Sequence, residues 1–149
     1  MKLYEHTQIG YTLLITLAMA IIFVGVLIVF TGMNWIGTAV LIMIAIVLLL
    51  FSSLTVILSE DVLYIKLGPG LVHRRFNLKN IELIRVVKNP WYYGWGVHTT
   101  PHGLLYNVSG FSAVEIKLKN GNTYRIGTDA PQELYEALQR ALEAQKKST

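Results

Sequence analysis

Residues 7–59 read TQIGYTLLITLAMAIIFVGVLIVFTGMNWIGTAVLIMIAIVLLLFSSLTVILS, and this stretch contains no Lys, Arg, His, Asp or Glu. Only 15% of the 149 residues are charged, compared with about 25% in an ordinary soluble domain. Apart from those in the first six residues, all charged side chains lie from Glu60 onward. The chain therefore has an apolar N-terminal third and a water-facing remainder, which call for separate interpretations.

The apolar stretch is long enough for two membrane-spanning helices. About 20 helical residues, at about 1.5 Å each, cross a hydrocarbon core of about 30 Å. The first predicted span covers residues 11–30 and the second covers residues 36–53, with the small and polar residues TGMNW (31–35) between them. A single helix over the whole stretch would be about 80 Å long. The sequence therefore predicts a transmembrane helical hairpin over residues 1–53.

Residues flanking the two spans indicate how the hairpin is oriented in a cell membrane. The loop between the spans has no charge, whereas Lys2 precedes the pair and several basic residues follow it, among them Arg74, Arg75, Lys79, Arg85 and Lys88. By the positive-inside rule, both termini are expected in the cytoplasm. A cleaved signal peptide is disfavoured because Glu5 offsets Lys2 and the apolar run is too long. Neither span contains an ionisable residue, so a plain anchor is expected instead of an ion path.

From residue 54 the pattern changes from continuous apolar to alternating. Leu54, Val56 and Leu58 recur with a period of two, which predicts a strand with one buried face. Further strands are predicted at residues 62–67, 72–76, 81–87, 96–98, 104–107, 113–119 and 123–126. Since the alternation starts directly after the second span, we expect no flexible linker between the helix and the first strand.

A capped amphipathic helix is predicted to end the chain. Asp129 is a suitable N-cap, and Pro131 is tolerated in the first helical turn. One apolar stripe follows at helical spacing: Leu134, Ala137, Leu138, Ala141 and Leu142. The sequence thus predicts an α+β membrane protein, in which residues 54–149 form a bent β-sheet or barrel capped by this C-terminal helix.

An ordered set of short motifs accompanies this pattern of elements. The motifs are SEDVLYI (59–65) with GPG (68–70), NIE (80–82), GWGV (94–97) before GLLYNVSG (103–110), VEIKLKNG (114–121) and IGTDAP (126–131) before Leu134. Together they resemble the bacterial PH-like (pleckstrin-homology-like) domain of small membrane proteins, which follows a transmembrane pair. The resemblance covers residues 53–149, and it implies a fold and a membrane setting but no catalytic residues.

The residues give no indication of catalysis, a metal or a cofactor. The chain has no cysteine, and it contains no nucleophile elbow, phosphate-binding loop or dinucleotide-binding pattern. His98 and His102 have no carboxylate within ten residues, and a zinc site needs more ligands than these two. We therefore expect neither an enzyme nor a metal site, and missing recognition modules make nucleic-acid binding equally unexpected.

Two groups of residues are candidate binding sites. Basic residues gather around the GPG turn and are candidates for binding lipid headgroups: Lys66, His73, Arg74, Arg75 and Lys79. Basic residues around the first hairpins of eukaryotic PH domains hold phosphoinositide headgroups, so the resemblance implies a similar site here. The alternative is a solvated basic surface that is only diffusely attracted to anionic lipid.

The second group is an aromatic run that consists of Trp91, Tyr92, Tyr93 and Trp95. These rings either close the open end of the barrel, enter the headgroup layer of the membrane, or form a patch for a protein partner.

The function predicted from these features is that of a membrane-anchored PH-like binding module without catalytic activity. It would engage a protein partner or anionic lipid headgroups at the cytoplasmic face of the membrane. The alternative is a structural or accessory subunit, whose hairpin packs on another membrane protein or on a second copy of the chain.

Overall fold

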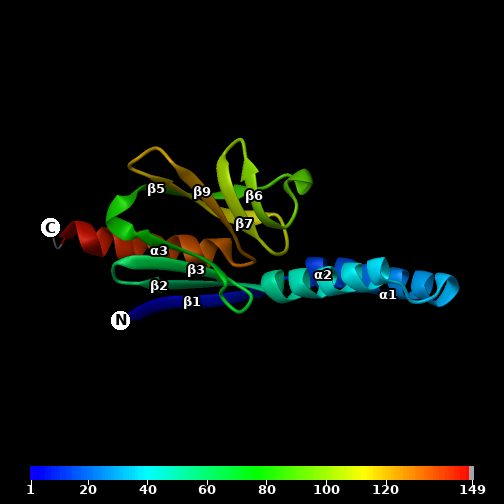
Figure 1. The fold of residues 1–149 in the computed structure, drawn as a ribbon. Helices are drawn as coiled ribbons and strands as arrows, with labels where there is room; N and C mark the ends of the chain where they lie inside the picture. Colours follow the sequence, from blue (N-terminus) through cyan, green and yellow to red (C-terminus); the bar gives the residue numbers. More distant parts are fainter. Residues whose placement is uncertain (148–149) are drawn as a thin grey trace.

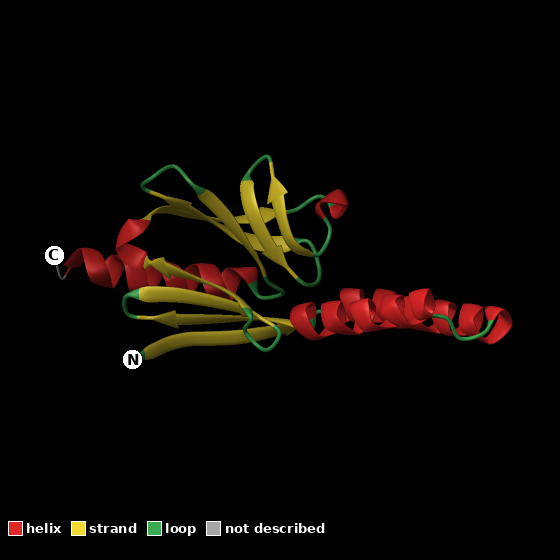
Figure 2. Cartoon of the chain, viewed as in Figure 1, coloured by secondary structure: helices red, strands yellow, loops and turns green. Residues whose placement is uncertain are grey.

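The computed structural model describes residues 1–147 as an α+β protein with two sheets, apolar helices near the N-terminus and a C-terminal helix (Figure 1). Helices α1 (Tyr11–Thr31) and α2 (Trp35–Phe51) lie side by side and project away from both sheets (Figure 2). Among the described residues, α1 is the one helix long and apolar enough to cross a membrane, and α2 is a shorter apolar helix of 17 residues. The Asn34 side chain caps α2 by accepting a hydrogen bond of 2.8 Å from the backbone N–H of Gly37.

The first sheet contains four antiparallel strands in the order β1-β2-β3-β4. They are β1 (Lys2–Ile9), β2 (Ser53–Ser59), β3 (Val62–Leu67) and β4 (Val72–Asn77). The strand β1 was not predicted from the sequence, which assigned residues 1–53 to the hairpin alone. It pairs with β2 from Ile9 opposite Ser53 to Lys2 opposite Ser59. The two helices are therefore an insertion between neighbouring strands of one sheet.

The second sheet contains five strands in the order β5-β8-β9-β7-β6. They are β5 (Ile81–Lys88), β6 (Gly96–Thr100), β7 (Gly103–Asn107), β8 (Ser112–Leu118) and β9 (Thr123–Gly127). All neighbouring strands are antiparallel except β7 and β9, which run parallel. Single turns of 3-10 helix, η1 (Leu78–Asn80) and η2 (Trp91–Tyr93), precede β5 and β6.

The helix α3 (Pro131–Lys147) packs against β1, β5 and β8 and so joins the two sheets. Its buried residues are the predicted stripe as far as Ala141: Leu134, Ala137, Leu138 and Ala141. Before the helix, Thr128 Oγ1 accepts a hydrogen bond of 3.1 Å from the N–H of Ala130. Asp129, expected to cap the helix, contacts His6 Nε2 on β1 at 2.5 Å. This contact ties the start of α3 to the first strand.

The junction between helices and sheet has no flexible linker, as predicted. Ser52 is the single residue between α2 and β2, and Gly10 is the single residue between β1 and α1. The backbone N–H of Gly10 donates to the carbonyl oxygen of Ser52 at 2.9 Å, which continues the β1–β2 ladder to the helix ends. The eight predicted strands after the hairpin are all present, with boundaries that differ by at most two residues.

Candidate functional site

The hairpin β3–β4 carries four of the five basic residues singled out in the sequence. Lys66 lies opposite His73 in this pair, and Tyr64 lies opposite Arg75. Leu63, Ile65 and Leu67 alternate with these residues on β3 and are fully buried in the core. Because successive side chains of a strand point to opposite faces, Tyr64, Lys66, His73 and Arg75 share the outer face of the first sheet. We call these four residues the outer basic face.

Contacts within the outer basic face hold its side chains in a defined arrangement. The Arg75 guanidinium carbon lies 5.3 Å from the centroid of the Tyr64 ring, a cation–π distance. The His73 ring lies 5.8 Å from the same ring, and its Nδ1 is 2.9 Å from the carbonyl oxygen of Gly70. Tyr64 thus forms a platform between two basic side chains, both of which are exposed to solvent.

Arg74 does not belong to this face, because it lies opposite Ile65 and points to the inner side of the sheet. Its Nη2 donates to the hydroxyl oxygen of Tyr124 on β9 at 3.2 Å, and its guanidinium carbon lies 5.6 Å from the Tyr124 ring. Arg74 therefore bridges the two sheets. Burial raises the pKa of the neighbouring Tyr106 hydroxyl, and the Arg74 charge only partly offsets this effect.

Lys79 lies apart from the other predicted residues. It is in η1, at the opposite end of β4 from the Gly68–Leu71 turn. There it lines a shallow depression with Lys119 and Lys146. The five basic residues predicted as one site are thus divided among the outer face, the space between the sheets and the end of the domain far from the helices.

The turn between β3 and β4 fixes the outer basic face close to the end of α2. The N–H of Gly68 donates to the carbonyl oxygen of Ser53 at 2.8 Å. A Cβ atom at residue 68 would lie only 2.3 Å from the carbonyl oxygen of Leu49, so glycine is required for this approach. The pair Lys66 and His73 flanks a turn that is packed directly against the last turn of α2.

The aromatic run follows β5 and crosses from one edge of the second sheet to the other, where β6 begins. Asn89, which precedes the run, donates its N–H to the carbonyl oxygen of Phe111 at 2.6 Å. Trp91 and Tyr92 are exposed, whereas Tyr93 and Trp95 are half-buried. The four residues predicted as one patch are therefore two exposed rings and two half-buried rings.

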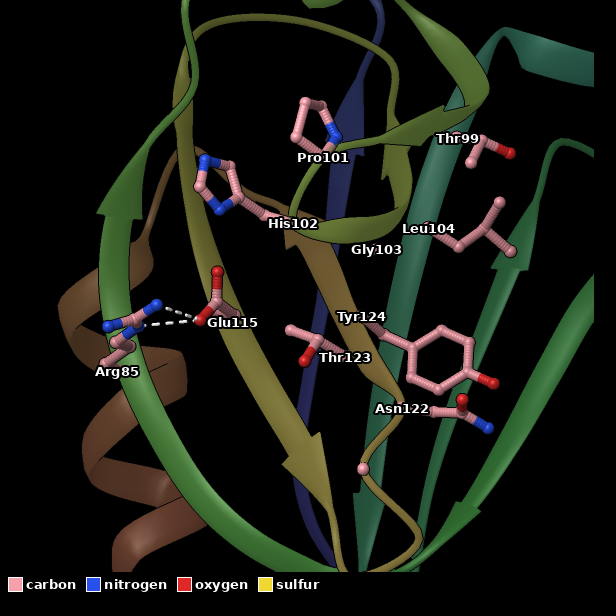
Figure 3. Close-up of a pocket in the computed structure, with 11 residues that line it drawn as sticks. Arg85, Thr99, Pro101, His102, Gly103, Leu104, Glu115, Asn122, Thr123 and Tyr124 are labelled. Atoms are coloured by element: carbon pink, nitrogen blue, oxygen red, sulfur yellow. Dashed lines mark hydrogen bonds and ion pairs between the residues drawn. The ribbon is translucent and has the colours of Figure 1, made fainter.

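A groove of about 600 Å³ lies between the β6–β7 and β8–β9 turns (Figure 3). Its floor includes Glu115, which is joined to Arg85 at 2.6 Å and to Arg125 at 2.7 Å. Arg125 also donates to Asn89 at 3.0 Å. Burial opposes the charge of Glu115, but the hydrogen bonds and charges of both arginines outweigh it and hold its pKa below the usual value. The carboxylate has a partner on each oxygen and so stabilises the β5-β8-β9 pairing.

Nothing in residues 1–147 groups three or more His, Cys, Asp or Glu side chains around a point that a metal ion could occupy. His98 contacts the carbonyl oxygen of Trp95 through its Nε2 atom, and His102 lies in the β6–β7 turn. The two histidines considered together in the sequence thus have separate surroundings.

Sequence reasoning missed two segments that bear on the site, namely β1 and the β7–β8 loop. Gln8 of β1 is buried, and its Nε2 donates to the carbonyl oxygen of Ser109 in that loop at 3.0 Å. Tyr4, His6 and Gln8 alternate with exposed residues, a period of two that could have revealed the strand. The polar composition of β1 concealed this signal, because a polar side chain such as Gln8 is buried there with a hydrogen-bond partner.

Comparisons of the chain with protein family models, with curated proteins and with solved structures found no match.

Proposed function

We propose that this chain is a membrane-anchored, PH-like binding module without catalytic activity, which binds anionic lipid headgroups through its outer basic face. The observation that carries this proposal is the contact between the Gly68 turn and the carbonyl oxygens of Leu49 and Leu50. It places Lys66 and His73 beside the end of an apolar helix, where the headgroups of a membrane crossed by that helix would lie. Two sheets joined by a C-terminal helix support the PH-like interpretation.

The topology supports a hairpin that crosses the membrane twice. The strands before α1 and after α2 pair with each other in one sheet, so both ends of the hairpin lie on the same side. If α1 crosses the membrane, α2 has to cross back. At about 1.5 Å per residue, the 17 residues of α2 are about 26 Å long, at the short end of the range for a span. Flanking anchors and local thinning of the bilayer accommodate a short span at modest cost.

Charge supports the cytoplasmic side and an anionic ligand. Anionic lipids of the cytoplasmic leaflet attract basic residues near the surface by about 1 kcal/mol for each Lys or Arg. The outer basic face contributes Lys66 and Arg75, and Glu5 of β1 lies three strands away from Arg75 in the same row of the sheet. A phosphate between Lys66, His73 and Arg75 would meet donors from both strands.

Titration of the full-length chain in mild detergent tests this function. Native mass spectrometry would count bound short-chain phosphatidylglycerol and phosphatidylcholine. We expect a clear preference for the anionic lipid, and a variant with Lys66→Gln and Arg75→Gln should lose about 30-fold in its affinity, the equivalent of about 2 kcal/mol.

The matched control carries Lys146→Gln and Lys147→Gln at the end of α3, which changes the net charge equally. Equal losses in both variants would show diffuse attraction and contradict a defined site. Retention of a membrane protein in place of lipid would instead favour an accessory subunit.

A further inference from the structure

Large exposed apolar side chains of the water-facing domain occur at both ends, with Met1 and Leu3 far from the helices and a larger group at the end from which the helices leave. Among residues 53–147 there are six: Leu71 (75% exposed), Leu83 (50%), Val86 (40%), Trp91 (76%), Tyr92 (68%) and Phe111 (49%). Leu83 and Val86 are on the strand β5. The other four lie in three loops, and we call Leu71, Trp91, Tyr92 and Phe111 the apolar rim.

Two of the three loops contact the base of the helix pair. The β3–β4 turn, which carries Leu71, packs on Leu49 and Leu50 as described above. The β7–β8 loop, which carries Phe111, reaches α1 through a hydrogen bond of 3.0 Å between Ser109 Oγ and Thr12 Oγ1. The same loop approaches Gly10, where a Cβ atom would lie 3.0 Å from the carbonyl oxygen of Val108.

The segment with Trp91 and Tyr92 is held at the same end. The Phe51 ring at the end of α2 lies beside Gly96, at the start of β6. A Cβ atom on Gly96 would be 3.8 Å from this ring. Figure 2 shows the η2 turn extending past the junction of α2 with β2, in the direction of the helix pair. Two loops of the apolar rim therefore lie at the helix base, and the third extends in the direction in which the helices project.

We propose that the apolar rim lies in the interfacial layer of the bilayer that the helices cross. This inference rests on the membrane anchoring proposed above, and the occupant it assigns to the rim is lipid. Trp and Tyr favour the headgroup level because one part of each ring system is apolar and another is polar. With only Gly10 and Ser52 as connections, the domain has no linker that would lift the rim into water.

The rim and the outer basic face have different lipid requirements. Apolar contact with the interface does not depend on headgroup charge, whereas the attraction of Lys66 and Arg75 does. The rim should therefore be immersed in a neutral bilayer as well as in an anionic one. This difference separates a failure of the rim from a failure of the headgroup site.

Spin labels at single cysteines test the rim in the full-length chain, whose natural sequence contains no cysteine. Labels at Leu71→Cys, Trp91→Cys and Phe111→Cys would be compared with Leu83→Cys on β5 and with Ile22→Cys near the middle of α1, in phosphatidylcholine vesicles. The measurement is the ratio of relaxation by oxygen, which partitions into lipid, to relaxation by a water-soluble nickel chelate. We expect rim ratios several-fold above that of Leu83→Cys and below that of Ile22→Cys.

Rim ratios equal to that of Leu83→Cys, with Ile22→Cys immersed, would overturn the proposal for the rim and leave the proposed anchor intact. A water-like ratio at Ile22→Cys would overturn both proposals. A label-free measurement uses a variant with Trp35→Phe and Trp95→Phe, in which Trp91 is the only tryptophan. Lipids brominated near the headgroup should quench its fluorescence strongly, and an unquenched Trp91 would contradict its immersion.

Discussion

The substitution Gly68→Ala should separate the domain from the end of α2. Gly68 has a φ of +50°, close to the left-handed region that an L-residue enters at a cost of about 1–2 kcal/mol. In addition, the new Cβ atom would lie 2.3 Å from the carbonyl oxygen of Leu49 and 2.7 Å from that of Leu50. Both obstacles are backbone atoms, so the turn has to move, at a further cost of about 1–3 kcal/mol.

Gly70→Ala in the same turn is the matched control. Its φ of +100° is farther from the left-handed minimum, but a Cβ atom there would meet nothing closer than the Lys66 side chain at 3.7 Å. If backbone strain alone determined stability, Gly70→Ala would therefore be the less stable variant. If docking of the turn on α2 determines it, Gly68→Ala is the less stable variant.

Thermal unfolding in mild detergent, followed by near-ultraviolet circular dichroism, measures the difference. At about 4–8 °C per kcal/mol, the clash of the new Cβ atom should lower the apparent Tm by about 4–24 °C. This decrease adds to the one that the positive φ causes in an alanine. An apparent Tm for Gly68→Ala equal to or above that of Gly70→Ala would refute the docked turn.

Three further outcomes follow from the same contacts. Arg125→Met should cost about 3–5 kcal/mol because it leaves the buried Glu115 short of a partner, and the double variant with Glu115→Leu should recover most of this loss in denaturant titrations. The depressed pKa of Glu115 means that its contribution is complete above its ordinary pKa of 4.5 and is lost as the pH falls through the folded value. Glu115→Gln should therefore flatten the decline of apparent Tm below about pH 5, and an unchanged slope would assign that decline to other groups. Deletion of residues 2–9 should lower the apparent Tm and expose the β2 edge to proteolysis, whereas equal protease resistance would show β1 to be dispensable.

The sequence was sufficient to predict the helices and strands whose pattern is carried by their own residues. Absence of charge over residues 7–59 located the two apolar helices, and alternation located the strands after them because their buried positions are apolar. The stripe from Leu134 to Ala141 identified the packing face of α3 for the same reason.

Features that depend on pairing between distant residues were not predictable in this way. Adjacent Arg74 and Arg75 look equivalent in sequence, yet the β3–β4 register turns one toward Tyr124 and the other toward Tyr64. Lys79 was grouped with them by its sequence position, but β4 carries it to the far end of the domain. The strand β1 has few apolar residues and became part of the sheet only through its pairing with β2.

The most direct test of the outer basic face is the distance between its nitrogen atoms and lipid phosphorus. Dipolar dephasing between ³¹P and ¹⁵N, in vesicles of the full-length chain with phosphatidylglycerol, reports contacts of a few ångströms. A phosphate bound by Lys66, His73 and Arg75 predicts dephasing at Lys66 Nζ and at the Arg75 guanidinium, with none at Lys146 or Lys147. Equal dephasing at all four residues, or none at Lys66 and Arg75, would contradict a defined headgroup site on this face.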